Sequence, residues 1–159
     1  MKTFFVVNPR SANGATGKRW VELAASIARS LPDFGVEFTQ GPMDAAKIAR
    51  GAIKGGYECI VAVGGDGTIN EVVNGFFEAD KVLNPKAALG VLPRGTGGDF
   101  RKSFGWELDS DSALNRLKTP DTRPLDVGRL DFLGHDGRPQ TRYFANICSF
   151  GVSGLVDQE

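Results

Sequence analysis

Short apolar runs alternate with longer amphipathic stretches through most of the chain, and this alternation limits the folds that the chain can adopt. The runs are rich in β-branched and aromatic residues and predict strands at residues 2–8, 36–39, 58–63 and 87–92. The stretches between them repeat apolar residues at the spacing of one helix face, which predicts helices at residues 17–31, 45–53, 69–77 and 113–117. This order predicts an α/β fold: an open, mainly parallel sheet with flanking helices.

The pattern changes after residue 122. Strand-like stretches at residues 125–133 and 141–150 are joined by a Gly134-His135-Asp136-Gly137 turn with no helix between them, which predicts an antiparallel hairpin. We therefore expect an α/β domain at residues 1–122 and the start of an antiparallel, β-rich domain at residues 123–159. Two strands are too few to close a sheet, so the second domain is expected to be incomplete here.

Charge and composition narrow the choice of function. The 19 basic and 19 acidic residues cancel to a formal net charge of +0, which argues against nucleic acid as a partner. The 41% hydrophobic and 24% charged fractions are typical of a soluble globular protein. Cys59 and Cys148 lie far apart in apolar stretches, as expected for small core residues in a reducing compartment. With no export signal and no apolar stretch long enough to span a membrane, we expect a cytoplasmic protein.

Glycine, with 21 residues, is about twice as frequent as in an average protein, and glycines cluster after the predicted strands. Residues 60–71 form a buried strand, a glycine-rich turn and the start of a helix. Thr68 and Glu71 have the spacing of a capping box, which predicts the helix start. The N–H groups and the dipole of a helix N-terminus attract anions, and glycine lets a phosphate approach the backbone.

Two further glycine-containing loops follow strands, at residues 89–100 and 7–18. The carboxyl ends of parallel strands lie at one edge of a sheet, where ligands of open α/β sheets bind, so the three loops together predict a polyphosphate site. None of them has the GxxxxGK[ST] sequence of a P-loop or the GxGxxG sequence of a dinucleotide fold. This argues against a P-loop NTPase and a Rossmann dehydrogenase.

An acidic residue, Asp66, lies inside the second of these loops. A carboxylate there would repel a phosphate unless it binds a cation or handles a proton, so we predict that Asp66 is catalytic. The alternative is that Asp66 only caps its own helix, because aspartate is favoured at that position.

The three loops resemble the catalytic domain of the diacylglycerol kinase family, which includes bacterial lipid kinases and sphingosine kinases. The family's GGDGT, NPxSG and PxGTxNDFA segments are matched, in that order, by Gly64-Gly65-Asp66-Gly67-Thr68, by Asn8-Pro9 with Ser11 and Gly14, and by Pro93-x-Gly95-Thr96-x-x-Asp99-Phe100. Gly98 stands in place of the family's Asn. Leu125-Asp126-Val127-Gly128 resembles the start of its C-terminal β-domain. NAD kinases and phosphofructokinases share GGDG, so the PxGTxxDF and LDVG segments are what favour a lipid kinase.

The resemblance implies a first domain of the NAD kinase/diacylglycerol kinase type and an ATP-dependent lipid kinase that uses Mg²⁺ and acts on a diacylglycerol- or sphingoid-type alcohol. This chain would carry the nucleotide-binding half, with Asp66 as the catalytic residue and Asp126 as a metal ligand. The implied nucleotide-binding residues are Asn8, Pro9, Ser11, Gly64, Gly65, Gly67, Thr68, Arg94, Gly95 and Thr96. In bacterial relatives the C-terminal domain adds lipid contacts and a glutamate proposed as general base. We therefore expect these 159 residues alone to bind nucleotide weakly and to phosphorylate no lipid.

A lipid acceptor implies peripheral contact with the inner face of the membrane. An exposed sheet edge can pair with a second copy of the chain, so a homodimer is a further expectation. Two other functions also stay open. One is a kinase of a soluble acceptor such as NAD, and the other is a nucleotide-binding module without catalysis.

Overall fold

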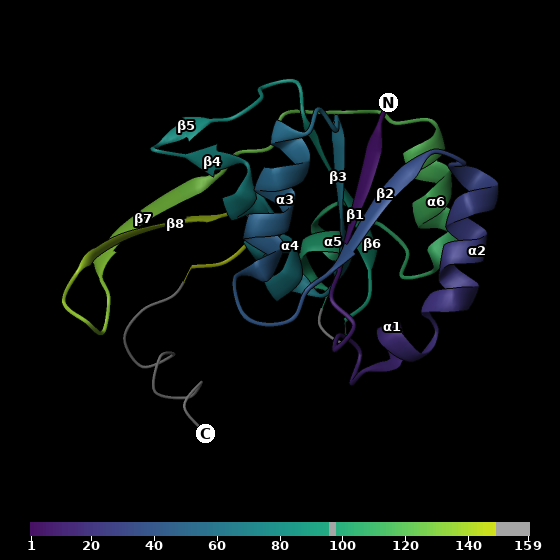
Figure 1. Ribbon diagram of the computed structural model, residues 1–159, viewed down its shortest axis with the longest axis horizontal. Helices are drawn as coiled ribbons and strands as arrows, with labels where there is room; N and C mark the ends of the chain where they lie inside the picture. Colours follow the sequence, from purple (N-terminus) through teal and green to yellow (C-terminus); the bar gives the residue numbers. More distant parts are fainter. Residues whose placement is uncertain (96–97, 149–159) are drawn as a thin grey trace.

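The computed structural model describes residues 1–95 and 98–148. Strands and helices alternate through the first part and a hairpin comes after them (Figure 1). In chain order the elements are β1 (Thr3–Val7), α1 (Ala15–Lys18), α2 (Trp20–Ser30), β2 (Phe34–Phe38), α3 (Asp44–Lys54), β3 (Cys59–Gly64), α4 (Asp66–Gly75), β4 (Phe77–Glu78), β5 (Lys81–Val82), β6 (Ala88–Pro93), α5 (Asp99–Ser103), α6 (Ser110–Lys118), β7 (Gly128–Leu133) and β8 (Pro139–Phe144).

The central sheet is parallel throughout, with the strand order β2-β1-β3-β6. Helices α2 and α6 cover one face, and α3 and α4 cover the other (Figure 1). Side chains of β3 alternate between the two cores: Val61 packs with α2 and α6, whereas Ile60 packs with α3 and α4. Because both faces of β3 are covered, its sequence is an unbroken apolar run. The predicted α/β fold is confirmed.

The predicted helices have different bounds in the structure. Helices α3 and α6 extend beyond the predicted residues 45–53 and 113–117 at both ends. The one expected at residues 17–31 is divided at Arg19, which has φ −101° and separates α1 from α2. The one expected at residues 69–77 begins earlier, at Asp66, and ends at Gly75. Phe77 instead starts the short β4–β5 hairpin.

The β4–β5 hairpin was not predicted. Its turn residues Ala79 and Asp80 have φ of 47° and 62°. Positive φ at both central positions is what a tight hairpin turn requires. Ala-Asp lacks the Asn-Gly or Asp-Gly pattern that usually indicates such a turn, so no local pattern marked this one.

The hairpin predicted after residue 122 is present. β7 and β8 pair antiparallel, from Gly128 opposite Phe144 to Leu133 opposite Pro139. The second strand is shorter than expected, and the last two residues of the predicted stretch, 149–150, lie outside the described residues. The domain boundary at residues 122 and 123 stays a prediction.

The two cysteines are free thiols in different surroundings. Cys59 is buried in β3, and this burial raises the pKa of its thiol to about 11. Cys148 is half-buried. Within residues 1–95 and 98–148, no helix combines the length and the apolar character needed to cross a membrane.

A close approach between α3 and α4 depends on Gly75. A Cβ added at Gly75 would lie 2.6 Å from the Ala46 carbonyl oxygen and 2.6 Å from Ala49 Cβ. We expect Gly75→Ala to reduce the free energy of unfolding by about 1–3 kcal/mol, because the two helices must separate. Urea denaturation followed by circular dichroism measures this change.

Gly51→Ala in α3 is the matched control for this prediction. Its added Cβ meets no atom of the described chain within 4 Å, and Gly51 is exposed. We expect Gly51→Ala to leave stability unchanged or to raise it by up to about 1 kcal/mol. Equal unfolding midpoints for Gly75→Ala and the wild type would contradict the close packing of α3 on α4.

Candidate functional site

The three predicted loops meet at one edge of the sheet. They follow β1, β3 and β6, which are neighbours in the strand order. The Asn8 N–H donates to the Val63 carbonyl oxygen at 2.9 Å, and the Arg94 N–H donates to the Gly64 carbonyl oxygen at 2.7 Å. The strand ladder therefore continues past the strands and holds the first residues of the loops together.

A side-chain contact ties the first loop to the second. Asn8 Nδ2 donates to Thr68 Oγ1 at 3.1 Å, and Asn8 Oδ1 accepts the Arg10 N–H at 3.0 Å. Thr68 is buried and packs over Gly64, where an added Cβ would overlap the Thr68 side chain. Asn8, Gly64 and Thr68 thus fix the relative position of two loops.

The predicted capping box is wrong. Helix α4 begins at Asp66 with Gly65 as its N-cap, so Thr68 lies inside the first turn. Glu71 Oε2 accepts the N–H of Ala45, at the start of α3, at 3.2 Å. Both side chains of the expected box therefore serve contacts between elements, and the spacing alone could not show this.

Asp66 caps a neighbouring helix instead of its own. Its Oδ2 accepts the Asp99 N–H at 3.0 Å and its Oδ1 accepts the Phe100 N–H at 3.3 Å. These are the first two residues of α5, in the third loop. The alternative that Asp66 caps α4 is therefore excluded by the geometry. Each carboxylate oxygen has a further lone pair, so Asp66 can still accept a proton or bind a cation.

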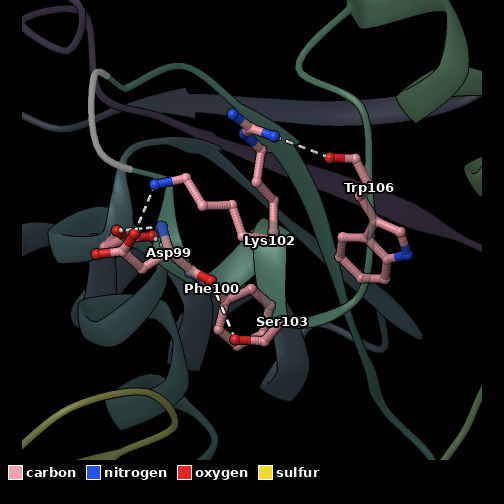
Figure 2. A network of polar contacts seen from close by, with 7 residues as sticks. Asp99, Phe100, Lys102, Ser103 and Trp106 are labelled. Carbon is pink, nitrogen blue, oxygen red and sulfur yellow. Dashed lines mark hydrogen bonds and ion pairs between the residues drawn. The ribbon is translucent and has the colours of Figure 1, made fainter.

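The start of α5 is held by a local network, drawn in Figure 2. Lys102 Nζ pairs with Asp99 Oδ1 at 2.8 Å, and the Ser103 hydroxyl donates to the Asp99 carbonyl oxygen at 3.1 Å. Arg101 Nη1 donates to the Trp106 carbonyl oxygen at 3.0 Å. This network fixes the segment whose N–H groups contact Asp66.

Gly98 stands where the third segment of the family pattern has asparagine. It is the N-cap of α5 and has φ +66°. Glycine adopts this conformation without strain, and asparagine is the side chain that tolerates it best. Glycine therefore suits the backbone at this position, where an added Cβ would lie 2.8 Å from Arg101 Nε.

The second and third loops touch backbone to backbone. A Cβ added at Gly95 would lie 2.8 Å from Gly65 Cα, whereas one at Gly65 would lie at an ordinary 3.5 Å from Gly95 Cα. Gly65 has φ −91°, and Gly95 is not in the left-handed region. Space, and not backbone conformation, is the reason for glycine at these two positions.

The first loop is shaped by its own polar groups. The Ser11 hydroxyl donates to the Asn8 carbonyl oxygen at 2.8 Å and lies 2.7 Å from Thr16 Oγ1. Gly17 packs against Pro9, where an added Cβ would lie 3.0 Å from the Pro9 carbonyl oxygen. Ser11 and Pro9 thus hold the loop in shape.

The remaining predicted residues have different surroundings. Arg94 is half-buried, and this burial, followed by the positive charge of Arg19, lowers the pKa of its guanidinium. Arg94 Nε is buried and has no hydrogen-bond partner in the described part of the chain. Gly67 is exposed in the first turn of α4. Thr96 lies outside the described residues.

Asp126 is exposed just before β7. Among the described residues, no group of three or more His, Cys, Asp and Glu side chains is close enough to hold a metal. A nucleotide-bound Mg²⁺ needs only one or two carboxylates beside the phosphates, so Asp66 alone fits this role. The metal role of Asp126 stays a prediction.

A sizeable cavity lies away from these residues. It has a volume of about 600 Å³, has a mainly apolar lining and runs along β6 between α4 and α6. Phe100 of the third loop lines it, but among the described residues neither Asp66 nor any of the predicted nucleotide-binding residues does. The three glycine-containing loops, which are predicted to bind phosphate and are called the phosphate loops below, lie at the carboxyl edge of the sheet.

Comparison with known proteins decides the family. The model of the diacylglycerol kinase catalytic domain matches residues 2–130, which include all three loops and Asp126. The chain belongs to this family. The resemblance predicted from the loop sequences is therefore confirmed.

Individual relatives agree with this assignment. The chain is 30% identical over 154 residues to a diacylglycerol kinase of Staphylococcus haemolyticus, covering 97% of the chain and 43% of that protein. It is 36% identical over 154 residues to a diacylglycerol kinase of Staphylococcus aureus, covering 97% and 45%. This member of the diacylglycerol kinase family thus spans less than half the length of these two relatives.

The fold is shared with a solved member. The crystal structure of a diacylglycerol kinase from Bacillus anthracis superposes with a TM-score of 0.67 at 24% identity, over 87% of this chain and 45% of that one. At this identity the likeness supports the fold alone.

Proposed function

We propose that the protein carrying this chain transfers the γ-phosphoryl group of ATP to the hydroxyl of a diacylglycerol- or sphingoid-type lipid, and that this chain is its nucleotide-binding half. The observation that carries the proposal is the meeting of three glycine-containing loops at the carboxyl edge of the sheet, joined by backbone hydrogen bonds. Family membership supports a kinase with an alcohol acceptor.

The loops supply the groups that hold a nucleotide. Backbone N–H groups at the start of α4 and the dipole of that helix attract phosphate oxygens. The absence of side chains at Gly65 and Gly95 leaves the backbone open to them. The Arg94 guanidinium, whose Nε has no partner among the described residues, adds positive charge from the third loop.

Phosphoryl transfer forms a bond between the acceptor oxygen and the γ-phosphorus and breaks the bond to the β–γ bridging oxygen, and the acceptor loses its proton. Asp66 lies at the N-terminus of α4, where it can hold a cation against the phosphates or take up that proton. Mg²⁺, when bound, neutralises charge on the phosphates. The contacts to Asp99 and Phe100 orient the Asp66 carboxylate for either role.

The test uses the intact protein that contains these residues. We expect calorimetry to show binding of ATP with magnesium, and we expect labelled ATP to transfer its γ-phosphate to diacylglycerol or sphingosine in mixed micelles. Label in NAD and none in lipid would support a soluble acceptor instead. Binding of ATP without transfer to either acceptor would support a non-catalytic module, and a lack of ATP binding would refute the proposal as a whole.

Contact with a membrane surface is a consequence of a lipid acceptor. The protein should sediment with vesicles that contain diacylglycerol more strongly than with vesicles that lack it.

A further inference from the structure

A buried asparagine joins the α/β part of the molecule to the β7–β8 hairpin. Asn74 lies in the last turn of α4 and is only 7% exposed. Its Nδ2 donates to the Tyr143 carbonyl oxygen at 2.7 Å, and its Oδ1 accepts the Tyr143 N–H at 2.9 Å. The side chain thus pairs with β8 through the same two backbone groups that a neighbouring strand would use.

The asparagine amide is fully engaged as a donor. The second Nδ2 hydrogen bond goes to the Asn70 carbonyl oxygen at 2.8 Å, inside α4. This contact fixes the orientation of the amide, with its oxygen toward the Tyr143 N–H. A side chain with two donors and an acceptor is needed to satisfy the three groups around it.

Other contacts support the same junction. The Phe77 and Tyr143 rings stack with centroids 3.8 Å apart and an interplanar angle of 10°. The Tyr143 hydroxyl donates to Asp80 Oδ1 at 3.0 Å, and Arg129 Nη2 pairs with Asp80 Oδ2 at 3.3 Å. The hairpin is therefore docked against the end of α4 and the β4–β5 turn, and Figure 1 shows these segments side by side.

Helix α4 connects this junction to the phosphate loops. Asp66 at its first residue contacts the third loop, and Asn74 is about 12 Å away along the same helix at 1.5 Å per residue. Asp126 precedes β7, whose first residue, Gly128, pairs beside Tyr143. One rigid helix therefore sets the distance between the phosphate loops and the place where the chain enters the hairpin.

We propose that Asn74 is a positioning residue that holds the β7–β8 hairpin, together with its entry segment at Asp126, at a fixed place relative to the phosphate loops. The consequence for catalysis rests on the proposed kinase function. Phosphoryl transfer requires the donor and the acceptor to be aligned, and a displacement of about 1 Å can reduce the rate by about 100-fold. Asn74 touches no predicted ligand site and acts only through this alignment.

Asn74→Asp tests the proposal with the smallest change in shape. The new carboxylate oxygen replaces both donors and faces the carbonyl oxygens of Tyr143 and Asn70, so the junction should open. Asn74→Ala removes the pairing without introducing repulsion. Asn115→Asp is the control, because Asn115 is exposed on α6 and its side chain makes no hydrogen bond within the described residues.

Hydrogen exchange at the Tyr143 amide reports on the junction directly. In both Asn74 variants we expect exchange at least about 10-fold faster, with ATP affinity within about threefold of wild type. Lipid phosphorylation should show kcat reduced by about 10- to 100-fold, more in Asn74→Asp than in Asn74→Ala. Asn115→Asp should leave all three measurements unchanged.

Hydrogen exchange at Tyr143 and lipid phosphorylation test this inference and the proposed function separately. Unchanged Tyr143 exchange would overturn the junction. An equal loss of ATP affinity and kcat would mean that Asn74 only stabilises the fold, which would overturn its positioning role. Faster exchange with unchanged kcat would overturn that role as well. All variants are made in the intact protein that contains these residues. If the intact wild type phosphorylates no lipid, the lipid kinase proposal fails and the junction is judged by the exchange result.

Discussion

Replacing Asp66 by Asn is expected to lower kcat for phosphoryl transfer by at least about 100-fold while ATP affinity stays within a few fold of the wild-type value. The substitution removes the negative charge that holds a cation or accepts a proton, and loss of such a group typically costs about 100- to 10,000-fold. The phosphate contacts predicted for the loops come from backbone N–H groups, which the substitution leaves in place. Steady-state kinetics and calorimetry on the same preparation measure both quantities.

A structural side effect of Asp66→Asn must be separated from the chemical one. The substituted side chain would have one oxygen, so it could accept from only one of the two N–H groups that Asp66 caps. Asp109→Asn controls for this, because Asp109 also accepts an N–H at a helix start, from Ser112 at 2.8 Å, and lies outside the site. We expect Asp109→Asn to retain wild-type kcat. Comparable kcat for Asp66→Asn and wild type would leave Asp66 with a structural role only.

Elements that depend on burial were predictable from sequence. β3 is apolar at every position because it is covered on both faces, and residues such as Ile60 and Val61 therefore indicate a central strand without further information. The meeting of the three loops was predictable for the same reason, since parallel strands place their carboxyl ends at one edge. Here local sequence and tertiary structure favour the same arrangement.

Side-chain partners distant in sequence were not predictable in this way. Thr68 and Glu71 have the spacing of a capping box, but each side chain bonds to a distant residue instead. Thr68 accepts a hydrogen bond from the Asn8 side chain, and Glu71 accepts one from the Ala45 N–H. The partners of Asp66 lie on α5, and no local rule relates the two segments. Asn74 carried no local signal either, because an asparagine near a helix end usually indicates only the end of the helix.

The backbone conformation of the loop glycines is not fixed by local sequence. Glycine in a turn can be left-handed, but neither Gly65 nor Gly95 is. Among the described residues of the three loops, positive φ occurs at Ala12, Asn13, Gly14 and Gly98. It occurs also at Ala79 and Asp80 in the turn that was not predicted. Close approach of two backbones explains Gly65 and Gly95, and only tertiary structure brings those backbones together.

Gly95→Val is expected to abolish ATP binding, with Kd raised by at least about 100-fold, which corresponds to about 2.8 kcal/mol. The added Cβ would lie 2.8 Å from Gly65 Cα, and a backbone atom cannot move aside as a flexible side chain can. The second and third loops must therefore separate, and the branched side chain also covers the backbone that the phosphates approach. Calorimetry with ATP and magnesium measures the change, and circular dichroism confirms that the variant is folded.

A series of substitutions of increasing size tests whether the contact between the second and third loops causes the loss of ATP binding. Gly95→Ala introduces the same clash with less bulk, whereas Gly65→Ala places its Cβ at an ordinary 3.5 Å from Gly95 Cα. We expect ATP affinity to fall in the order Gly65→Ala, Gly95→Ala, Gly95→Val, with Gly51→Ala in α3 at the wild-type value. Gly65→Val should also block binding, because its branched side chain extends into the phosphate approach. Wild-type ATP affinity in a folded Gly95→Val would mean that the phosphates bind away from these loops, and the carboxyl edge of the sheet would then lose its assignment as the nucleotide site.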